Sequence, residues 1–238
     1  MLGIFFILAL SWVLLHFIEK KNLLALGVLP IGFRLGQLAV GFVFISLVSY
    51  GLIYHESIVK QIEWTLNQEI EILSIFGSLF YHFKSAVTEE LIFRGALLYI
   101  LISKLGRSKA LWLSAVCFGV YHWFSYSMFG RGLVQMTYVF VTTALMGYVW
   151  GYTFAKTQSI MLPLGLHLGW NFIRTLCYEA APYGELIWKE TSRTELLEWN
   201  GFYYSILTGL AVPIITYLFV RYFFSEADTP NLENETNR

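Results

Sequence analysis

Long apolar segments alternate with short polar stretches along almost the whole chain. Seven of these segments approach the roughly 20 residues that a helix needs to cross a bilayer. Inside hydrocarbon every backbone amide must be satisfied within its own segment, so we expect each segment to be a helix. The pattern predicts an all-α fold, a polytopic transmembrane helix bundle with about seven spans. The expected spans are 2–18, 35–54, 87–103, 110–124, 133–155, 160–178 and 203–224.

Two longer polar stretches interrupt this pattern. Residues 58–83 place charged and apolar side chains at amphipathic spacing, which indicates a helix lying along the membrane interface or leading into the next span. Residues 179–201 carry many charges beside Trp188 and Trp199, which is typical of a surface excursion anchored by aromatic rings. We therefore expect an amphipathic interfacial helix before the third span and an exposed connection before the last one.

The composition agrees with a membrane environment. Of the 238 residues, 57% are hydrophobic and 13% are charged, against about 25% charged in an ordinary soluble domain. The formal net charge is zero, so we expect no nucleic-acid partner. We interpret residues 1–224 as a single integral membrane domain with a motif core at 83–178, and residues 225–238 as a disordered polar tail. The expected location is the cell (plasma) membrane, with a multi-pass chain surrounded by the lipid bilayer.

Several polar side chains fall within the apolar segments. A charge at the centre of a transmembrane helix costs about 3 kcal/mol on insertion scales. Such residues therefore need partners inside the protein, and they are the first candidates for function. These residues are Glu89, Glu90, Arg94, His122, His167 and Asn171.

The first group lies in the sequence TEELIFR at 88–94. Arg94 follows Glu90 by four residues, so the two share a helix face and can form a charge-assisted pair. Glu89 is rotated from Glu90 by about 100° and points elsewhere. A simpler interpretation is also open, because Thr88 is a good N-cap residue and glutamates in a first helical turn favour the helix dipole.

The other two groups repeat the one-turn spacing. Phe118 and His122 are four residues apart in one expected span, and His167 and Asn171 are four apart in another. Gly165 and the glycine one turn later lie near the opposite face of the second helix, where a neighbouring helix can approach closely. Three helices that each bring polar groups into hydrocarbon are best satisfied by one shared polar cavity.

Such a cavity suits the hydrolysis of a peptide bond. A buried carboxylate such as Glu89 can accept a proton near neutral pH, and His122 can help to orient a water molecule beside it. Asn171 and His167 can donate hydrogen bonds to the oxyanion that forms at an attacked carbonyl. The residues expected to hold this group in position are Glu90, Arg94 and Phe118.

Three motifs carry a resemblance to a known family. The sequences EELIFR, FGVYH and HLGWN match the forms EExxxR, FxxxH and HxxxN, in this order and on separate expected helices. Over about residues 83–178 the chain thereby resembles the CAAX protease and bacteriocin-processing family of glutamate-dependent intramembrane endopeptidases. The resemblance implies a metal-independent enzyme without a cofactor, in which Glu89 is the base, His122 its partner, and His167 with Asn171 the oxyanion site. It also implies a membrane-associated peptide or lipidated protein as substrate, as in peptide maturation, CAAX-type processing or bacteriocin-related processing.

Other functions are open at this point. One carboxylate and two histidines can hold a catalytic zinc, although the chain lacks HExxH and Asn171 is a poor zinc ligand. Buried glutamate and histidine also occur in transporters and proton relays. A non-enzymatic membrane scaffold that binds a peptide is a third alternative. Arg174, seven residues after His167, is interpreted as a side chain that snorkels to the interface, with a substrate carboxylate or a lipid headgroup as the alternative partner.

Overall fold

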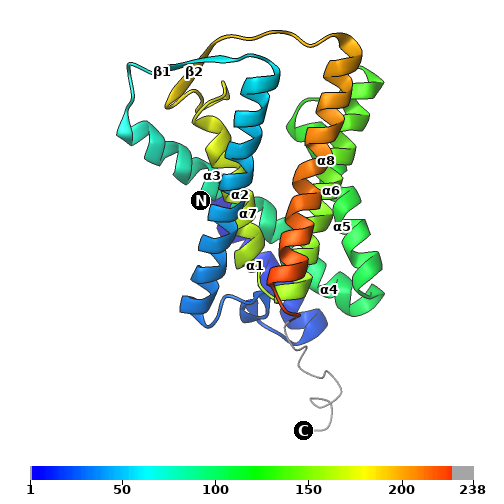
Figure 1. Ribbon diagram of the computed structural model, residues 1–238. Coiled ribbons are helices and arrows are strands. Elements are labelled where there is room, and N and C mark those ends of the chain that lie inside the picture. Colours follow the sequence, from blue (N-terminus) through cyan, green and yellow to red (C-terminus); the bar gives the residue numbers. More distant parts are fainter. Residues whose placement is uncertain (1, 227–238) are drawn as a thin grey trace.

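The computed structural model describes residues 2–226, and Figure 1 shows their arrangement. The predicted tail at 225–238 lies outside the described residues from position 227 onward. Helices make up most of the described chain, which confirms the all-α prediction. The elements are α1 (Leu2–Leu14), the π-helix η1 (Leu15–Glu19), the 3₁₀ helix η2 (Leu23–Leu26), α2 (Ile31–Val59), β1 (Glu63–Leu66), α3 (Ile72–Phe93), α4 (Ala96–Leu105), α5 (Arg107–Ser125), α6 (Leu133–Thr157), α7 (Met161–Thr175), β2 (Trp188–Ser192) and α8 (Glu198–Phe223).

Four helical segments among the described residues are long and apolar enough to cross a membrane. The bundle carries large apolar side chains on its exterior, among them Phe6, Leu47 and Leu207, which are 70%, 67% and 70% exposed. An apolar exterior of this extent suits contact with lipid rather than with water. The chain is therefore a membrane-embedded helix bundle. The four segments are Leu2–Glu19, Leu23–Val59, Leu133–Thr157 and Glu198–Phe223.

The third expected span, at 87–103, is divided between two helices. α3 ends at Phe93 and α4 begins at Ala96. A Cβ atom at Gly95 would lie 2.1 Å from the carbonyl oxygen of Leu91, so the turn between the helices requires a glycine. Because apolar residues flank Arg94 and Gly95 on both sides, the apolar pattern alone does not reveal the turn.

The expected interfacial helix at 58–83 also differs from the structure. α2 continues to Val59, β1 follows, and α3 begins only at Ile72. β1 pairs with β2 in an antiparallel two-stranded sheet, which lies beside the end of α2 in Figure 1. Pairing with a strand distant in the sequence thus overrides the local amphipathic spacing. The connection at 179–201 contains β2, and both Trp188 and Trp199 are exposed.

Helix α7 lies inside the bundle and packs against α2 and α3. A Cβ atom at Gly165 would lie 2.1 Å from the carbonyl oxygen of Leu38, and one at Gly169 would lie 2.7 Å from that of Phe42. Both neighbours belong to α2, which confirms that the glycine face of α7 admits a close helix. The face of α7 that carries His167 is thereby turned toward the remaining helices.

The other half of the bundle consists of α5, α6 and α8, with α6 packed between the other two. The halves meet through stacked rings of Phe44 in α2 and Phe219 in α8, whose centroids are 3.6 Å apart. A buried cluster that includes Phe118, Trp150 and Leu166 fills the space between them. Polar groups on α3, α5 and α7 consequently face the same interior.

Candidate active site

Glu89 and Glu90 lie in the last two turns of α3 and have different surroundings. Glu90 is fully buried, whereas Glu89 is partly exposed. Thr88 is inside the helix, where its hydroxyl donates to the carbonyl oxygen of Lys84 at 2.8 Å, so the interpretation of this cluster as a capped helix start is wrong. The rotation of about 100° between successive residues directs the two carboxylates toward different neighbours.

Arg94 holds Glu90, as the one-turn spacing predicts. Its Nη1 lies 3.2 Å from Oε1 of Glu90, and both side chains are 0% exposed. Nη2 donates to the carbonyl oxygen of Gly147 in α6 at 3.3 Å, and the guanidinium carbon lies 4.1 Å from the ring centroid of Phe118 in α5. Phe118 therefore contacts the buried cation directly, an arrangement favourable to both groups. Through these contacts Arg94 links α3 to α5 and α6.

One ring nitrogen of His122 is held by the backbone, and the other can accept a hydrogen bond. Its Nδ1 lies 2.8 Å from the carbonyl oxygen of Phe118. Because a carbonyl oxygen only accepts, Nδ1 carries the hydrogen, and Nε2 of the neutral ring keeps its lone pair. His122 is buried, with 6% of its surface exposed. Its Nε2 can therefore accept a hydrogen bond from a water molecule or a substrate group.

His167 is fixed between both glutamates. Its Nδ1 lies 2.8 Å from Oε1 of Glu90, and its Nε2 lies 3.7 Å from Oε2 of Glu89. The ring of Trp150 stacks on it, with centroids 4.3 Å apart. The Glu90 carboxylate accepts and His167 donates from Nδ1, so Glu90 sets the orientation of the ring.

These contacts include a direct pairing that the sequence did not predict. We expected His122 to act with Glu89 on a water molecule, a role that stays a prediction, and Glu90 to support Glu89. Among residues 2–226, the imidazole in direct contact with Glu89 is that of His167, and Glu90 holds His167. This contact forms because α3 packs directly against α7.

One cavity of about 730 Å³ collects the expected residues. Phe118 also lines it, whereas Glu90 and Arg94 are fully buried behind its wall. The structure thus brings the three motif groups, from α3, α5 and α7, around one space. The residues of the predicted catalytic set that line this space are Glu89, His122, His167 and Asn171.

Other cavity residues were not expected from the sequence. The Ser85 hydroxyl donates to Oε1 of Glu89 at 3.3 Å, and its position one turn before Glu89 is the signal that points to it. Trp150 also lines the cavity and stacks on His167. It is one of many aromatic residues in apolar segments, so nothing in the sequence distinguishes it.

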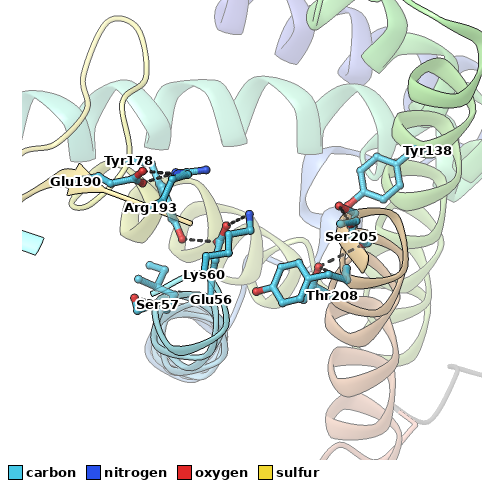
Figure 2. A network of polar contacts seen from close by, with 12 residues as sticks. Glu56, Ser57, Lys60, Tyr138, Tyr178, Glu190, Arg193, Ser205 and Thr208 are labelled. Carbon is cyan, nitrogen blue, oxygen red and sulfur yellow. Dashed lines mark hydrogen bonds and ion pairs between the residues drawn. The ribbon is translucent and has the colours of Figure 1, made fainter. Parts of the chain in front are cut away.

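Polar residues line the outer end of the cavity, and Figure 2 shows contacts of several of them. Nζ of Lys60 lies 2.6 Å from Oε1 of Glu56, and the Tyr178 hydroxyl donates to Oε2 of the same carboxylate at 2.7 Å. Across the cavity the Tyr138 hydroxyl donates to the carbonyl oxygen of Ser205 at 3.1 Å. These groups come from both halves of the bundle, so the cavity runs between the halves from Glu89 to this outer rim.

The alternative of a catalytic zinc requires a set of metal-binding side chains. Within residues 2–226, no group of three or more histidine, cysteine, aspartate or glutamate side chains is arranged to hold a metal ion. The Nδ1 atoms of His122 and His167 are each engaged by an oxygen of the protein.

Part of the chain matches a known family model. Residues 71–173 match the family model described as Type II CAAX prenyl endopeptidase Rce1-like, which confirms the resemblance carried by the three motifs. No curated protein and no solved structure matches the chain significantly. Together with the apolar helices, the family match indicates an integral membrane protein of the protease class that acts on a membrane-associated substrate.

Proposed function

Because residues 71–173 match the Rce1-like family model, we propose that this chain is an intramembrane endopeptidase that hydrolyses a peptide bond with a water molecule activated by Glu89. The observation that carries this proposal is the convergence of Glu89 with His122, His167 and Asn171 on one cavity. The proposed substrate is a membrane-associated peptide or lipidated protein, for which a prenylated CAAX-type peptide is the natural first probe. The proposed location is the cell membrane.

Glu89 is the proposed base because its carboxylate lines the cavity and has no arginine partner among residues 2–226. The Glu90 carboxylate is paired with Arg94, whereas Oε2 of Glu89 is buried without a hydrogen-bond donor in the described part of the chain. A carboxylate in such surroundings is suited to accepting a proton from water. Nε2 of His122, with its lone pair, accepts the second hydrogen of the same water and so orients it.

The oxyanion is proposed to form on the α7 side of the cavity. In its doubly protonated form, His167 donates from Nδ1 to Glu90 and from Nε2 into the cavity. Asn171 lies one turn further along the same face of α7 and supplies an amide N–H. Donors that are held in place before the reaction stabilise developing charge without reorganisation.

The proposed hydrolysis has two steps. Glu89 takes a proton from water while the water oxygen attacks the carbonyl carbon, which gives a tetrahedral intermediate. The C–N bond then breaks, and the proton held by Glu89 moves to the leaving nitrogen. The products are a carboxylic acid and an amine, and Glu89 returns to its starting carboxylate form.

The test is the substitution Glu89→Gln, which keeps the size of the side chain and removes its ability to take a proton. We expect cleavage to fall about 10²- to 10⁴-fold, the usual contribution of a positioned base. The measurement is a quantitative comparison of membrane-peptide termini between cells with the native chain and cells with the variant. Glu69→Gln serves as the matched control, because Glu69 is exposed and does not line the cavity. Identical termini with native and Glu89→Gln chains would contradict the proposal and favour a non-enzymatic scaffold.

A further inference from the structure

Arg174 lies at the outer part of the cavity, in the last turn of α7. Its guanidinium carbon lies 5.3 Å from the ring centroid of Trp170 and 4.7 Å from that of Tyr178. No ion pair or hydrogen bond of this guanidinium is present among residues 2–226. The nearby carboxylate of Glu56 is already occupied by Lys60 and Tyr178. Arg174 is thus a cavity-lining cation that is held by aromatic rings and forms no ion pair within the described part of the chain.

A location at a helix C-terminus explains a positive charge, because the helix dipole favours cations there. It does not explain why this guanidinium, on a cavity wall, forms no ion pair with a carboxylate of the described residues. Stacking on aromatic rings occupies the faces of the guanidinium plane and leaves its N–H edges free. Those edges form the planar fork that binds carboxylate or phosphate through two parallel hydrogen bonds.

The position of Arg174 relative to the catalytic end is set by α7. His167 and Arg174 are seven residues apart in this helix, which corresponds to a rise of about 10 Å at 1.5 Å per residue. An extended peptide covers that distance with about three residues. A peptide whose attacked carbonyl lies at His167 and Asn171 therefore brings a carboxyl group close to Arg174 when a short stretch follows the cleaved bond.

We propose that Arg174 binds the free C-terminal carboxylate of the substrate and so selects peptides that end shortly after the cleaved bond. This inference rests on the proposed function, since it assigns the substrate end that the same cavity receives. Arg174 follows the matched family region, which ends at residue 173. Its role is that of a specificity-determining residue, which contacts the substrate at a distance from the reacting atoms.

The experiment measures binding, so it does not depend on turnover. The Glu89→Gln chain in phosphatidylcholine vesicles is titrated with a fluorescent prenylated CAAX-type peptide, made once as the free acid and once as the C-terminal amide. We expect the acid to bind at least about tenfold more tightly than the amide, as a charge-assisted double hydrogen bond predicts. Adding Arg174→Gln should abolish this preference and leave binding of the amide unchanged. Arg174→Lys should retain part of it, because lysine keeps the charge but not the fork.

Two controls separate the possible results. Arg131→Gln removes an exposed charge that does not line the cavity, and it should preserve the preference for the acid. A second set of vesicles contains phosphatidylglycerol. If Arg174→Gln weakens both peptides equally, and only in those vesicles, Arg174 holds a lipid phosphate and the proposal is overturned.

The inference and the proposed function fail in distinguishable ways. Equal binding of acid and amide by the chain with Arg174 intact, or no binding of either, overturns the inference. The proposed function fails instead when the native chain and the Glu89→Gln chain leave the same membrane-peptide termini. A preference for the acid that Arg174→Gln abolishes supports the inference whichever way the cleavage experiment turns out.

Discussion

Two glutamate–cation pairs lie near the cavity, one behind its inner end and one at its outer rim. They have the same separation in the sequence but differ in how deeply their side chains are buried. Glu90 with Arg94 and Glu56 with Lys60 are each four residues apart, and each cation is the residue that follows the end of the helix. The inner side chains are 0% exposed, whereas those of Lys60 and Glu56 are 19% and 17% exposed. The two pairs therefore show what burial adds to the same local arrangement.

The outer contact is the shorter one, at 2.6 Å against 3.2 Å, yet we expect the inner contact to matter more. The difference in distance changes the Coulomb energy by only about a fifth. A change of effective dielectric constant from about 80 to about 20 changes it about fourfold. Burial, rather than sequence spacing or contact distance, thus decides how strongly the two charges of each pair interact.

Removal of the inner cation is expected to have the largest effect on stability. In Arg94→Gln the Glu90 carboxylate stays buried without its cation, and loss of one partner of a buried pair costs about 3–5 kcal/mol. The free energy of unfolding can be followed by thiol labelling of Cys177, which is buried, in a Cys117→Ala background, because Cys117 is exposed. Arg131→Gln, at an exposed position, is the matched control.

A double variant sharpens this prediction. Glu90→Gln combined with Arg94→Gln leaves no unpaired charge, so we expect it to regain part of the lost stability. If Arg94→Gln has the same free energy of unfolding as the native chain, burial does not increase the contribution of the inner pair to stability.

Loss of the proposed oxyanion donor is expected to affect catalysis and to leave stability nearly unchanged. Asn171→Ala should slow cleavage of a prenylated peptide about 10²- to 10³-fold, or about 2.7–4 kcal/mol in activation free energy. The control is Thr208→Ala, because Thr208 lines the same cavity and bonds only within its own helix. If both variants lose the same activity in a kcat measurement, the chemistry does not depend on the inner end of the cavity.

Neutralisation of the outer carboxylate is expected to have the smallest effect. In Glu56→Gln the amide oxygen can still accept the hydrogen bond from Tyr178, and a partly exposed ion pair contributes about 1 kcal/mol or less. The same labelling of Cys177 measures the change. A loss of stability as large as that of Arg94→Gln would remove the distinction between the two pairs.

The features that the sequence predicted are those within a single helix. The pairing of Glu90 with Arg94 follows from 3.6 residues per turn, and the close approach at Gly165 follows from the missing side chain. The contact of Glu90 with His167 joins residues 77 positions apart, and no local spacing predicts it. The break at Gly95 was missed for a related reason, since hydrophobicity reports burial in lipid and not the direction of the backbone.

The sequence by itself determined that this chain forms apolar helices and which polar groups must be hidden inside them, because helical periodicity and the cost of charges in hydrocarbon are local properties. Only the tertiary structure decided that His167, and not His122, contacts Glu89, and that Arg174 reaches the cavity. Those contacts depend on how α3, α5 and α7 rotate against one another. That rotation is set by packing among all the helices together.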